Sequence, residues 1–243
     1  MLLKLRSLVF LVVFYLWGTT SCLLWLPMLY IPGVPRRWHV AFQTIWLRTV
    51  HFWLRLIVGL GMTVRGREYI SDKAVIYAVK HQSMLDTFIM HAILDDPTFI
   101  MKQELLQIPL YGRVCEKVGN IPIDRDMGMK SMKKMLKRSR REIDAGRSVI
   151  IFPEGSRADP GEKHAYLPGI FGIYKYLDVP VVPVAVNTGL YWPRHGPLKP
   201  GKFVIEFLPP IAPGLQKQKF MTRLEETIET ASRDLLTLVE TEK

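Results

Sequence analysis

Cysteine is scarce in this sequence, because its 243 residues contain only Cys22 and Cys115. Cys22 lies inside a long apolar stretch, which argues against a disulfide framework and fits a reducing compartment. A Cys/His cluster with the spacing of a metal site is also lacking, so we expect no metal ion. Internal repeats, low-complexity tracts and nucleic-acid-binding motifs are lacking too. We therefore expect one globular domain and no nucleic-acid partner.

Charge is missing from one long stretch near the N-terminus, since no charged residue occurs between Ser7 and Pro35. The helix-compatible part, from Ser7 to about Pro27, would extend roughly 30 Å, which is enough to cross a bilayer core. A cleaved signal peptide is the alternative, with Lys4 and Arg6 as its basic start. A membrane segment is favoured because Leu23 to Ile31 stays apolar beyond any plausible cleavage point.

A second apolar segment runs from Trp38 to about Gly59, after a helix-breaking Pro-Gly-Val-Pro sequence at residues 32–35. Its polar positions Arg48, His51 and Arg55 share one helical face, which predicts a helix that lies in a membrane interface. Basic residues flank the first segment on both sides, so their distribution does not orient it. A spanning helix and a re-entrant hairpin in one leaflet both stay open.

Acidic residues are too few to balance the basic ones, which leaves a formal net charge of +11. This balance suits an anionic membrane surface or an anionic substrate. Residues 130–147 are especially basic, and Met129, Met132, Leu136 and Ile143 recur there at helical spacing. The pattern predicts a helix with an apolar core stripe and a solvated basic face. That face could also attract anionic lipid headgroups or an acidic carrier protein.

After Gly61 the pattern changes to short β-branched runs that alternate with helical ones. The expected strands are Met62–Arg67, Ala74–Val79, Thr98–Met101, Asn120–Ile123, Ser148–Phe152, Val181–Val186 and Lys202–Phe207. The expected helices are Met84–Leu94, Met127–Ala145, Ile170–Leu177 and Lys219–Val239. This alternation predicts an α/β domain with a mixed sheet flanked by helices. We therefore divide the chain into N-terminal membrane-anchoring helices (1–60) and a globular domain (61–243).

The first candidate reactive stretch is Lys80-His81-Gln82-Ser83-Met84-Leu85-Asp86, directly after an expected strand. His81 precedes a helix and Asp86 lies in its first turn, so the two side chains can fold onto each other. The carboxylate would accept the proton of one ring nitrogen and leave the other nitrogen as a base. This is a Ser-His-Asp arrangement without the serine, because a substrate hydroxyl can be the nucleophile. A structural histidine is the alternative.

The second stretch, Gly119-Asn120-Ile121-Pro122-Ile123-Asp124-Arg125, places Arg125 after an apolar strand. The guanidinium could clamp a phosphate bidentately. It could equally pair with Asp124 or Asp126, and the stretch alone favours that structural pairing.

The third stretch, Phe152-Pro153-Glu154-Gly155-Ser156-Arg157, leads from an apolar strand into a tight turn. The turn explains the proline and the glycine but not the charges of opposite sign beside them. Arg157 is a second phosphate candidate, and Ser156 and the amides of the loop are further donors.

The fourth stretch is Val179-Pro180-Val181-Val182-Pro183-Val184-Ala185-Val186. Two prolines in an apolar strand predict an edge or a bulged strand. Such a strand would line an acyl groove or simply belong to the core.

In this order the four stretches resemble the four blocks of the glycerolipid acyltransferases, most closely the 1-acyl-sn-glycerol-3-phosphate (lysophosphatidic acid) acyltransferases. The resemblance covers roughly Met62 to Phe207, and the N-terminal segments resemble the family's membrane anchor. It implies transfer of an acyl chain from acyl-CoA or acyl-acyl-carrier-protein to the free sn-2 hydroxyl of 1-acyl-sn-glycerol-3-phosphate. The product would be phosphatidic acid, formed in phospholipid biosynthesis without a cofactor.

Residue by residue, the resemblance makes His81 the catalytic base and Asp86 the carboxylate that orients it. It implies that the substrate is bound by Arg125, Glu154, Gly155, Ser156, Arg157 and Lys102. The expected partners are membrane lipids, lysophosphatidic acid and the acyl donor. The expected location is a membrane, with the active site at its cytoplasmic face.

This sequence departs from the family pattern at three places. Lys80 stands where the family often has Asn, Ser156 stands where Thr is usual, and Leu167–Gly172 lacks a Lys that family members often have nearby. These departures leave the acceptor headgroup open. The alternatives are a transacylase or an acyltransferase for another lysolipid and, outside enzymes, a non-catalytic membrane lipid-binding protein.

Overall fold

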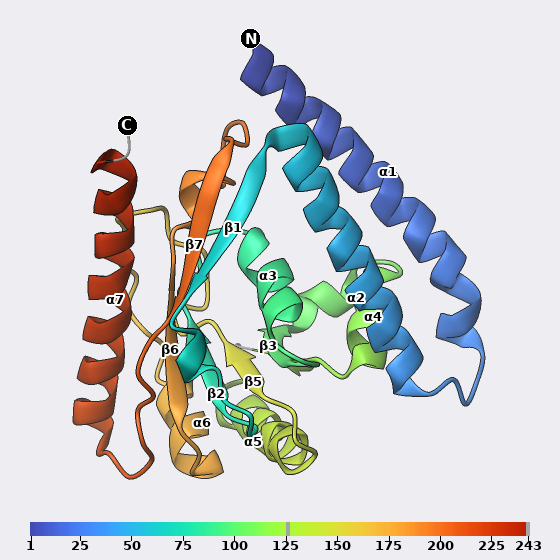
Figure 1. Cartoon of the computed structure of the whole chain (residues 1–243). Helices are drawn as coiled ribbons and strands as arrows, with labels where there is room; N and C mark the ends of the chain where they lie inside the picture. Colours follow the sequence, from blue (N-terminus) through green and yellow to red (C-terminus); the bar gives the residue numbers. More distant parts are fainter. Residues whose placement is uncertain (125–126, 242–243) are drawn as a thin grey trace.

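The computed structural model describes residues 1–124 and 127–241 (Figure 1). Within these residues seven strands form one sheet in the order β1-β7-β6-β2-β5-β3-β4. The strands are β1 (Leu60–Arg65), β2 (Ile76–Val79), β3 (Thr98–Lys102), β4 (Ile121–Ile123), β5 (Val149–Ile151), β6 (Val181–Val186) and β7 (Gly201–Phe207). Neighbouring strands run parallel except β6 and β7, which are antiparallel. The predicted mixed sheet is confirmed.

Helices cover both faces of the sheet (Figure 1). They are α1 (Leu2–Tyr30), α2 (Arg36–Trp53, continued by a π-helical turn at Leu54–Val58), α3 (Leu85–Ile93), α4 (Tyr111–Val118), α5 (Gly128–Asp144), α6 (Gly169–Leu177) and α7 (Lys217–Thr241). One apolar cluster packs α1, α2 and α3 on one face, and the other packs α5, α6 and α7 on the opposite face. Because both faces are covered, β2, β5 and β6 are buried along their whole length and appear in the sequence as continuous apolar runs.

Strand β6 corrects part of the prediction drawn from its prolines. It lies between β7 and β2 in the middle of the sheet, so the edge position is wrong. The predicted bulge is present. Val181 pairs with Ile211 and Ala185 pairs with Glu206, so the segment from Glu206 to Ile211 has one residue more than the segment of β6 that it pairs with. Pro183 lies within this mismatch, where its carbonyl accepts from the Leu208 N–H (3.0 Å). A missing N–H is tolerated there because the ladder is already out of register.

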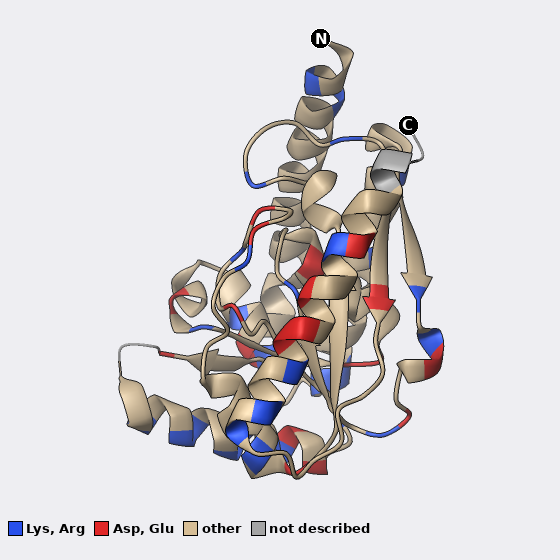
Figure 2. Cartoon of the chain, turned by 90° about the vertical axis from the view of Figure 1, so that its left-hand side faces the viewer, with Lys and Arg blue, Asp and Glu red and all other residues tan. Residues whose placement is uncertain are grey.

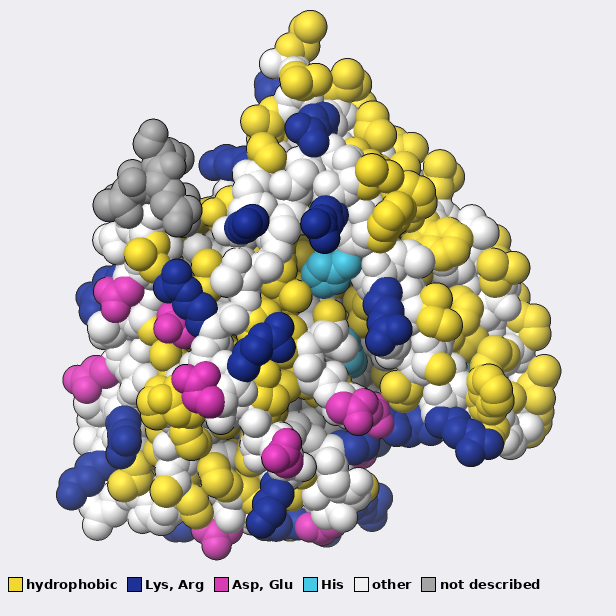
Figure 3. Space-filling view, viewed as in Figure 1, with side chains coloured by type: hydrophobic (Ala, Val, Ile, Leu, Met, Phe, Trp, Pro, Cys, Tyr) yellow, Lys and Arg dark blue, Asp and Glu magenta, His cyan; other side chains and the backbone are white. Residues whose placement is uncertain are grey.

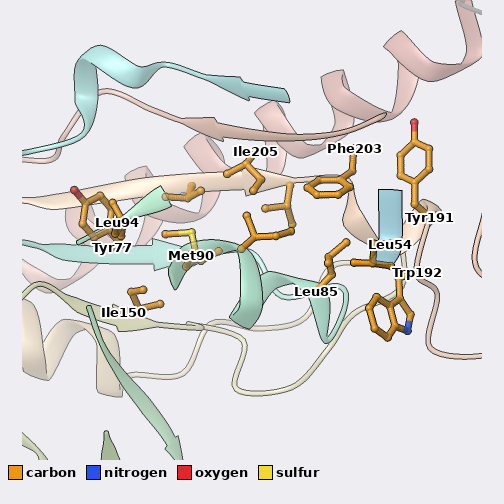
Figure 4. Packing of buried hydrophobic residues seen from close by; sticks show 14 of the residues in the cluster. Leu54, Tyr77, Leu85, Met90, Leu94, Ile150, Tyr191, Trp192, Phe203 and Ile205 are labelled. Atoms are coloured by element: carbon orange, nitrogen blue, oxygen red, sulfur yellow. The ribbon is translucent and has the colours of Figure 1, made fainter. Parts of the chain in front are cut away.

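Helix α1 is long and apolar enough to cross a membrane, by length and composition. Only 17% of its most apolar window is buried, and hydrophobic side chains cover its outer side (Figure 3). Its inner side, however, packs on the rest of the protein: Phe10 is buried and meets Trp192 edge to face, with ring centroids 5.5 Å apart. Leu54, after α2, lies beside Leu85 and Trp192 in the same cluster (Figure 4). The N-terminal helices therefore share a core with the sheet.

Helix α5 is amphipathic, as predicted, and Figure 2 shows lysine and arginine along it. Lys133, Lys134, Lys137 and Arg141 are exposed. Met132, Leu136 and Ile143 pack on the core as expected. The expected place of Met129 in that stripe is wrong, because its side chain is 80% exposed in the first turn of the helix. Its role in the core is taken by the buried Met135. The basic face is therefore solvent-exposed.

Candidate active site

The sequence stretches that carry reactive groups meet at one edge of the sheet. Strands β5, β2 and β6 are adjacent and parallel, so their carboxyl ends lie side by side. The chain that leaves β2 contains Lys80 to Asp86, the chain that leaves β5 contains Phe152 to Arg157, and the chain that leaves β6 contains Asn187 to Arg194. Crevices at such strand ends are where open α/β sheets bind their ligands.

His81 and Asp86 form the predicted pair. The His81 Nδ1 atom lies 2.9 Å from Oδ2 of Asp86, whose side chain is completely buried. Oδ2 also accepts the backbone N–H groups of Gln82 (2.7 Å) and Ser83 (2.8 Å). Three donors converge on one oxygen, so Nδ1 must carry the ring proton and Nε2 is left as the acceptor. The geometry is that of a general base held in one tautomer.

The second oxygen of Asp86 is occupied from another strand, because Oδ1 accepts the hydroxyl of Thr188 directly after β6. Two more hydrogen bonds join the same segments. The Gly189 N–H donates to the Gln82 side chain (3.2 Å), and the Ser83 hydroxyl donates to the Trp192 carbonyl (2.8 Å). The segment after β6 thus fixes the stretch that contains the dyad.

The imidazole of His81 stacks on Phe152, with centroids 4.1 Å apart and an interplanar angle of 22°. Its side chain keeps 16% of its surface exposed and lines a cavity of about 450 Å³. That volume is in the range of sites for small organic ligands. The His81 ring therefore faces a space large enough for a small organic ligand.

The cavity has an apolar part and a cationic part. Its apolar lining comes from both sides of the sheet and includes Trp46, Leu47, Phe88, Phe99, Met101, Val114, Ile123, Ile151, Leu167 and Ile170. Its cationic lining is Lys102, Arg157 and Arg194. All three cations are exposed, and none forms an ion pair with the described residues 1–124 and 127–241. An amphiphile with an acyl chain and an anionic headgroup fits this division.

His91 is a second histidine of the cavity lining, where its Nε2 lies 3.3 Å from the Gln43 side-chain nitrogen. Burial lowers the pKa of His91 to about 4, against a smaller opposing effect of Asp96. The ring is therefore neutral at physiological pH and adds no charge to the apolar part of the cavity.

Most of the predicted substrate-binding residues line this cavity. Lys102, Gly155, Ser156 and Arg157 all do so. Gly155 adopts a positive φ of 69° in the tight turn, a conformation that glycine takes without strain. Arg125 lies outside the described residues, so its predicted contact with the acceptor phosphate stays a prediction.

Glu154 is placed differently from the prediction. Its side chain is completely buried, it does not line the cavity, and both of its oxygens are occupied within the protein. Oε1 accepts from the Lys80 ammonium (2.7 Å), and Oε2 accepts from the His81 backbone N–H (3.0 Å). A direct contact between Glu154 and a phosphate is thus contradicted by this arrangement. A buried carboxylate has no donor to offer an anion, and here it binds the main chain of His81.

Two contributors to the site were missed from the sequence, Thr188 and Arg194. Thr188 directly follows β6, a position where reactive groups are expected. That β6 lies beside β2 cannot be read from the order of elements along the chain, so the contact with Asp86 was not predictable. Arg194 gave no signal, since an isolated arginine in a Pro-Arg-His-Gly segment is most often a surface residue. No group of three metal-ligating side chains occurs among the residues that the structure describes.

Comparison with known proteins agrees with this geometry. A model of the acyltransferase family matches residues 61–187. The 1-acyl-sn-glycerol-3-phosphate acyltransferase of Pseudomonas aeruginosa is 31% identical over 188 residues, which are 76% of this chain and 73% of that protein. The enzyme of the same name from Saccharomyces cerevisiae is 30% identical over 180 residues, 72% of this chain and 59% of that protein. The enzyme of that name from Cocos nucifera is 28% identical over 161 residues, 65% of this chain and about half (52%) of that protein.

Among solved structures, the crystal structure of the 1-acyl-sn-glycerophosphate (LPA) acyltransferase from Thermotoga maritima is similar to this chain. The TM-score is 0.75, and the match covers 96% of this chain and 98% of the other. At 20% sequence identity this likeness concerns the fold. It extends over the N-terminal helices as well as the sheet.

Proposed function

This chain belongs to the acyltransferase family, and we propose that it acylates the free sn-2 hydroxyl of 1-acyl-sn-glycerol-3-phosphate to form phosphatidic acid. It is an O-acyltransferase of phospholipid biosynthesis, which is supported by relatives named 1-acyl-sn-glycerol-3-phosphate acyltransferase. The observation that carries the assignment is the His81–Asp86 pair at a cavity with an apolar lining and a cationic rim. A lysophosphatidic acid presents an acyl chain, a hydroxyl and a phosphate to just such a surface.

His81 carries the chemistry in this proposal. Its Nε2 takes the proton of the acceptor hydroxyl while that oxygen attacks the carbonyl carbon of the donor thioester. The new C–O bond forms, the C–S bond breaks, and the proton passes from His81 to the departing thiolate. Asp86 stabilises the imidazolium between these two transfers, because its buried carboxylate remains hydrogen-bonded to Nδ1. The acceptor itself is the nucleophile, so no acyl group is attached to the protein.

The acceptor phosphate is held by the cations at the cavity. Lys102 and Arg157 support this role by their exposure, their lack of an ion-pair partner among the described residues, and their place in the lining that contains His81. Arg157 can bind the phosphate through two parallel N–H donors. Ser156, in the same loop, adds a hydroxyl donor.

The acyl donor is a thioester, acyl-CoA or acyl-acyl-carrier-protein, and the reaction requires no further cofactor. The location that we propose is a membrane, with the active site at its cytoplasmic face where such thioesters occur. The exposed apolar side of α1 supports membrane association, since a face of this kind is stable in contact with lipid. The membrane lipids would thus be partners as well as the source of the acceptor.

The function is tested with purified protein in detergent and a panel of acceptors. The panel contains lysophosphatidic acid, lysophosphatidylcholine, lysophosphatidylethanolamine and glycerol 3-phosphate, each with labelled acyl-CoA or labelled acyl-acyl-carrier-protein. We expect labelled phosphatidic acid as the main product. A preference for a zwitterionic lysolipid would refute the assigned acceptor. Label transfer from an intact phospholipid without any thioester would indicate a transacylase.

A further inference from the structure

The lysine next to the catalytic histidine is buried in the protein interior. Lys80 directly precedes His81, yet its side chain is only 1% exposed. Its ammonium nitrogen lies 2.7 Å from Glu154 Oε1, 2.8 Å from Glu229 Oε1, 3.0 Å from Glu229 Oε2 and 3.1 Å from the Glu162 carbonyl. These acceptors use all three ammonium hydrogens. Lys80 therefore cannot bind substrate, and its role must be internal.

Two carboxylates face this single ammonium, and they come from distant parts of the chain. Glu154 belongs to the loop after β5, whereas Glu229 belongs to the C-terminal helix α7. Glu229 is held in turn by the Tyr166 hydroxyl (2.9 Å). Burial and the neighbouring Glu229 raise the pKa of that hydroxyl, so it stays protonated and donates. A buried ion pair often adds little to stability compared with apolar packing, so its presence here points to the geometry that it imposes.

The geometry concerns the main chain of His81. Glu154 uses one oxygen for Lys80 and the other for the His81 N–H (3.0 Å). The His81 carbonyl accepts the Ala158 N–H (2.8 Å) from the same loop. The side chain of the base is fixed by Asp86 and its main chain by the loop after β5. The position of Glu154 therefore sets where the base stands.

We propose that Lys80 and Glu229 are positioning residues for the acyl transfer, on the basis of the function proposed above. Glu229 forms an ion pair with Lys80, and Lys80 forms an ion pair with Glu154. Glu154 accepts a hydrogen bond from the His81 N–H and so fixes the position of His81 relative to the cavity. Neither Lys80 nor Glu229 lines that cavity. The C-terminal helix thereby acts on the active site through a chain of three charges, of which Lys80 and Glu154 are buried and Glu229 is partly buried.

The test replaces Glu229 by Gln. The amide oxygen can take the place of Oε1, where it still accepts from Lys80 and from the Tyr166 hydroxyl. The NH₂ group then replaces Oε2, where it cannot accept from the Lys80 ammonium. The side chain keeps its size while the network loses one charge and one acceptor. The matched control is Glu225→Gln, one helical turn earlier on α7, which removes an ion pair with Lys163 but none of the hydrogen bonds of Lys80, Glu154 or Glu229. We expect Glu229→Gln to lower kcat by about ten-fold, since small displacements of reacting groups cost about one to two orders of magnitude. The KM of both substrates should stay within about two-fold, and Glu225→Gln should match the wild type.

Circular dichroism and thermal melting in detergent show whether each variant is folded. If Glu229→Gln is unfolded at the assay temperature, Tyr166→Phe takes its place, with an expected loss of about five-fold in kcat for one hydrogen bond. A folded variant whose kcat equals that of Glu225→Gln overturns the proposal. So does a rise in the KM for lysophosphatidic acid at unchanged kcat, because the network would then serve binding. Wild-type protein that fails to acylate lysophosphatidic acid refutes the proposed function instead.

Discussion

The replacement Asp86→Asn tests the electrostatic part of the dyad with unusual clarity, because the structure dictates how an amide would sit. Two backbone N–H groups and His81 Nδ1 surround Oδ2, so only the amide oxygen fits there. The NH₂ group would face Thr188, whose hydroxyl can rotate and accept instead of donate. His81 therefore keeps its tautomer in Asp86→Asn. What is lost is the negative charge.

The magnitude follows from that loss. The attraction between a carboxylate and an imidazolium about 4 Å apart in partly screened surroundings is about 4 kcal/mol, which is an upper value. A hydrogen bond to a charged group is stronger than one to a neutral group by about 1–2 kcal/mol. The barrier should rise by about 2–4 kcal/mol, which is roughly a 30- to 1000-fold fall in kcat. This is smaller than the roughly 10⁴-fold loss known for a Ser-His-Asp triad in which the amide imposes the wrong tautomer.

The assay measures phosphatidic acid formation at saturating donor and acceptor, with His81→Ala as the lower reference. Thr188→Val is the companion variant. It leaves Asp86 charged but takes one donor from Oδ1, so it should cost stability more than rate. If Asp86→Asn is as inactive as His81→Ala while folded, the amide is flipped and the derived orientation is wrong. If it is as active as the wild type, Asp86 does not support the base.

Three further predictions follow from the cavity and the helices. Arg157→Lys should raise the KM for lysophosphatidic acid about five- to ten-fold, because lysine lacks the planar guanidinium that binds a phosphate through two N–H groups. The KM for the acyl donor should stay unchanged. The control is Arg113→Lys, at an exposed arginine outside the cavity. The pKa of His91 is about 4 in the folded protein and about 6.5 in the unfolded chain. The unfolded chain therefore binds a proton more readily, and the free energy of unfolding falls as the pH drops from about 6.5 toward 4. On going from pH 7.5 to 5 the wild type should lose about 2 kcal/mol more than His91→Phe, or about 4–8 °C in Tm; equal losses would contradict the assignment. Finally, the protein should remain bound to membranes in about 1 M salt, where electrostatic interactions are screened within about 3 Å, and should be released only by detergent. Release by salt alone would show that the basic face of α5, and not α1, holds the protein on the membrane.

The sheet could be predicted from the sequence because its strands are buried on both faces. Continuous β-branched runs such as Val149–Ile151 are typical of a central strand, whereas the prolines of Val181–Val186 wrongly favoured an edge position. The short elements around Gln103–Val118 were not predicted, since a 3-10 turn and the short helix α4 carry too little periodicity to be recognised. The order of strands was equally hidden, because it depends on long-range pairing that no local pattern encodes.

For the site, the dyad was predictable because both partners lie within one turn of the same helix start. Ser156 and Arg157 were predictable because they follow a strand, and Lys102, the last residue of β3, was predicted from the resemblance to the family. Glu154 was assigned the wrong contact, because the sequence does not reveal that the Lys80 ammonium and the His81 N–H occupy both of its oxygens. Thr188 was missed for a related reason: its partner Asp86 is distant in sequence and near only in the folded sheet. Contacts between segments that are distant in sequence decided each of these cases.

The central claim is that His81 activates the hydroxyl of lysophosphatidic acid without an acyl-protein intermediate. The most direct test uses an acyl donor labelled in its acyl chain. The reaction of the wild type and of His81→Ala is stopped with acid at short times, lipid is separated from protein, and the label in each fraction is measured. We expect label in phosphatidic acid from the first time point and none on the wild-type protein, and no product above background from His81→Ala with unchanged circular dichroism and Tm. Label that accumulates on the protein before phosphatidic acid appears would contradict the claim, as would wild-type turnover by folded His81→Ala protein.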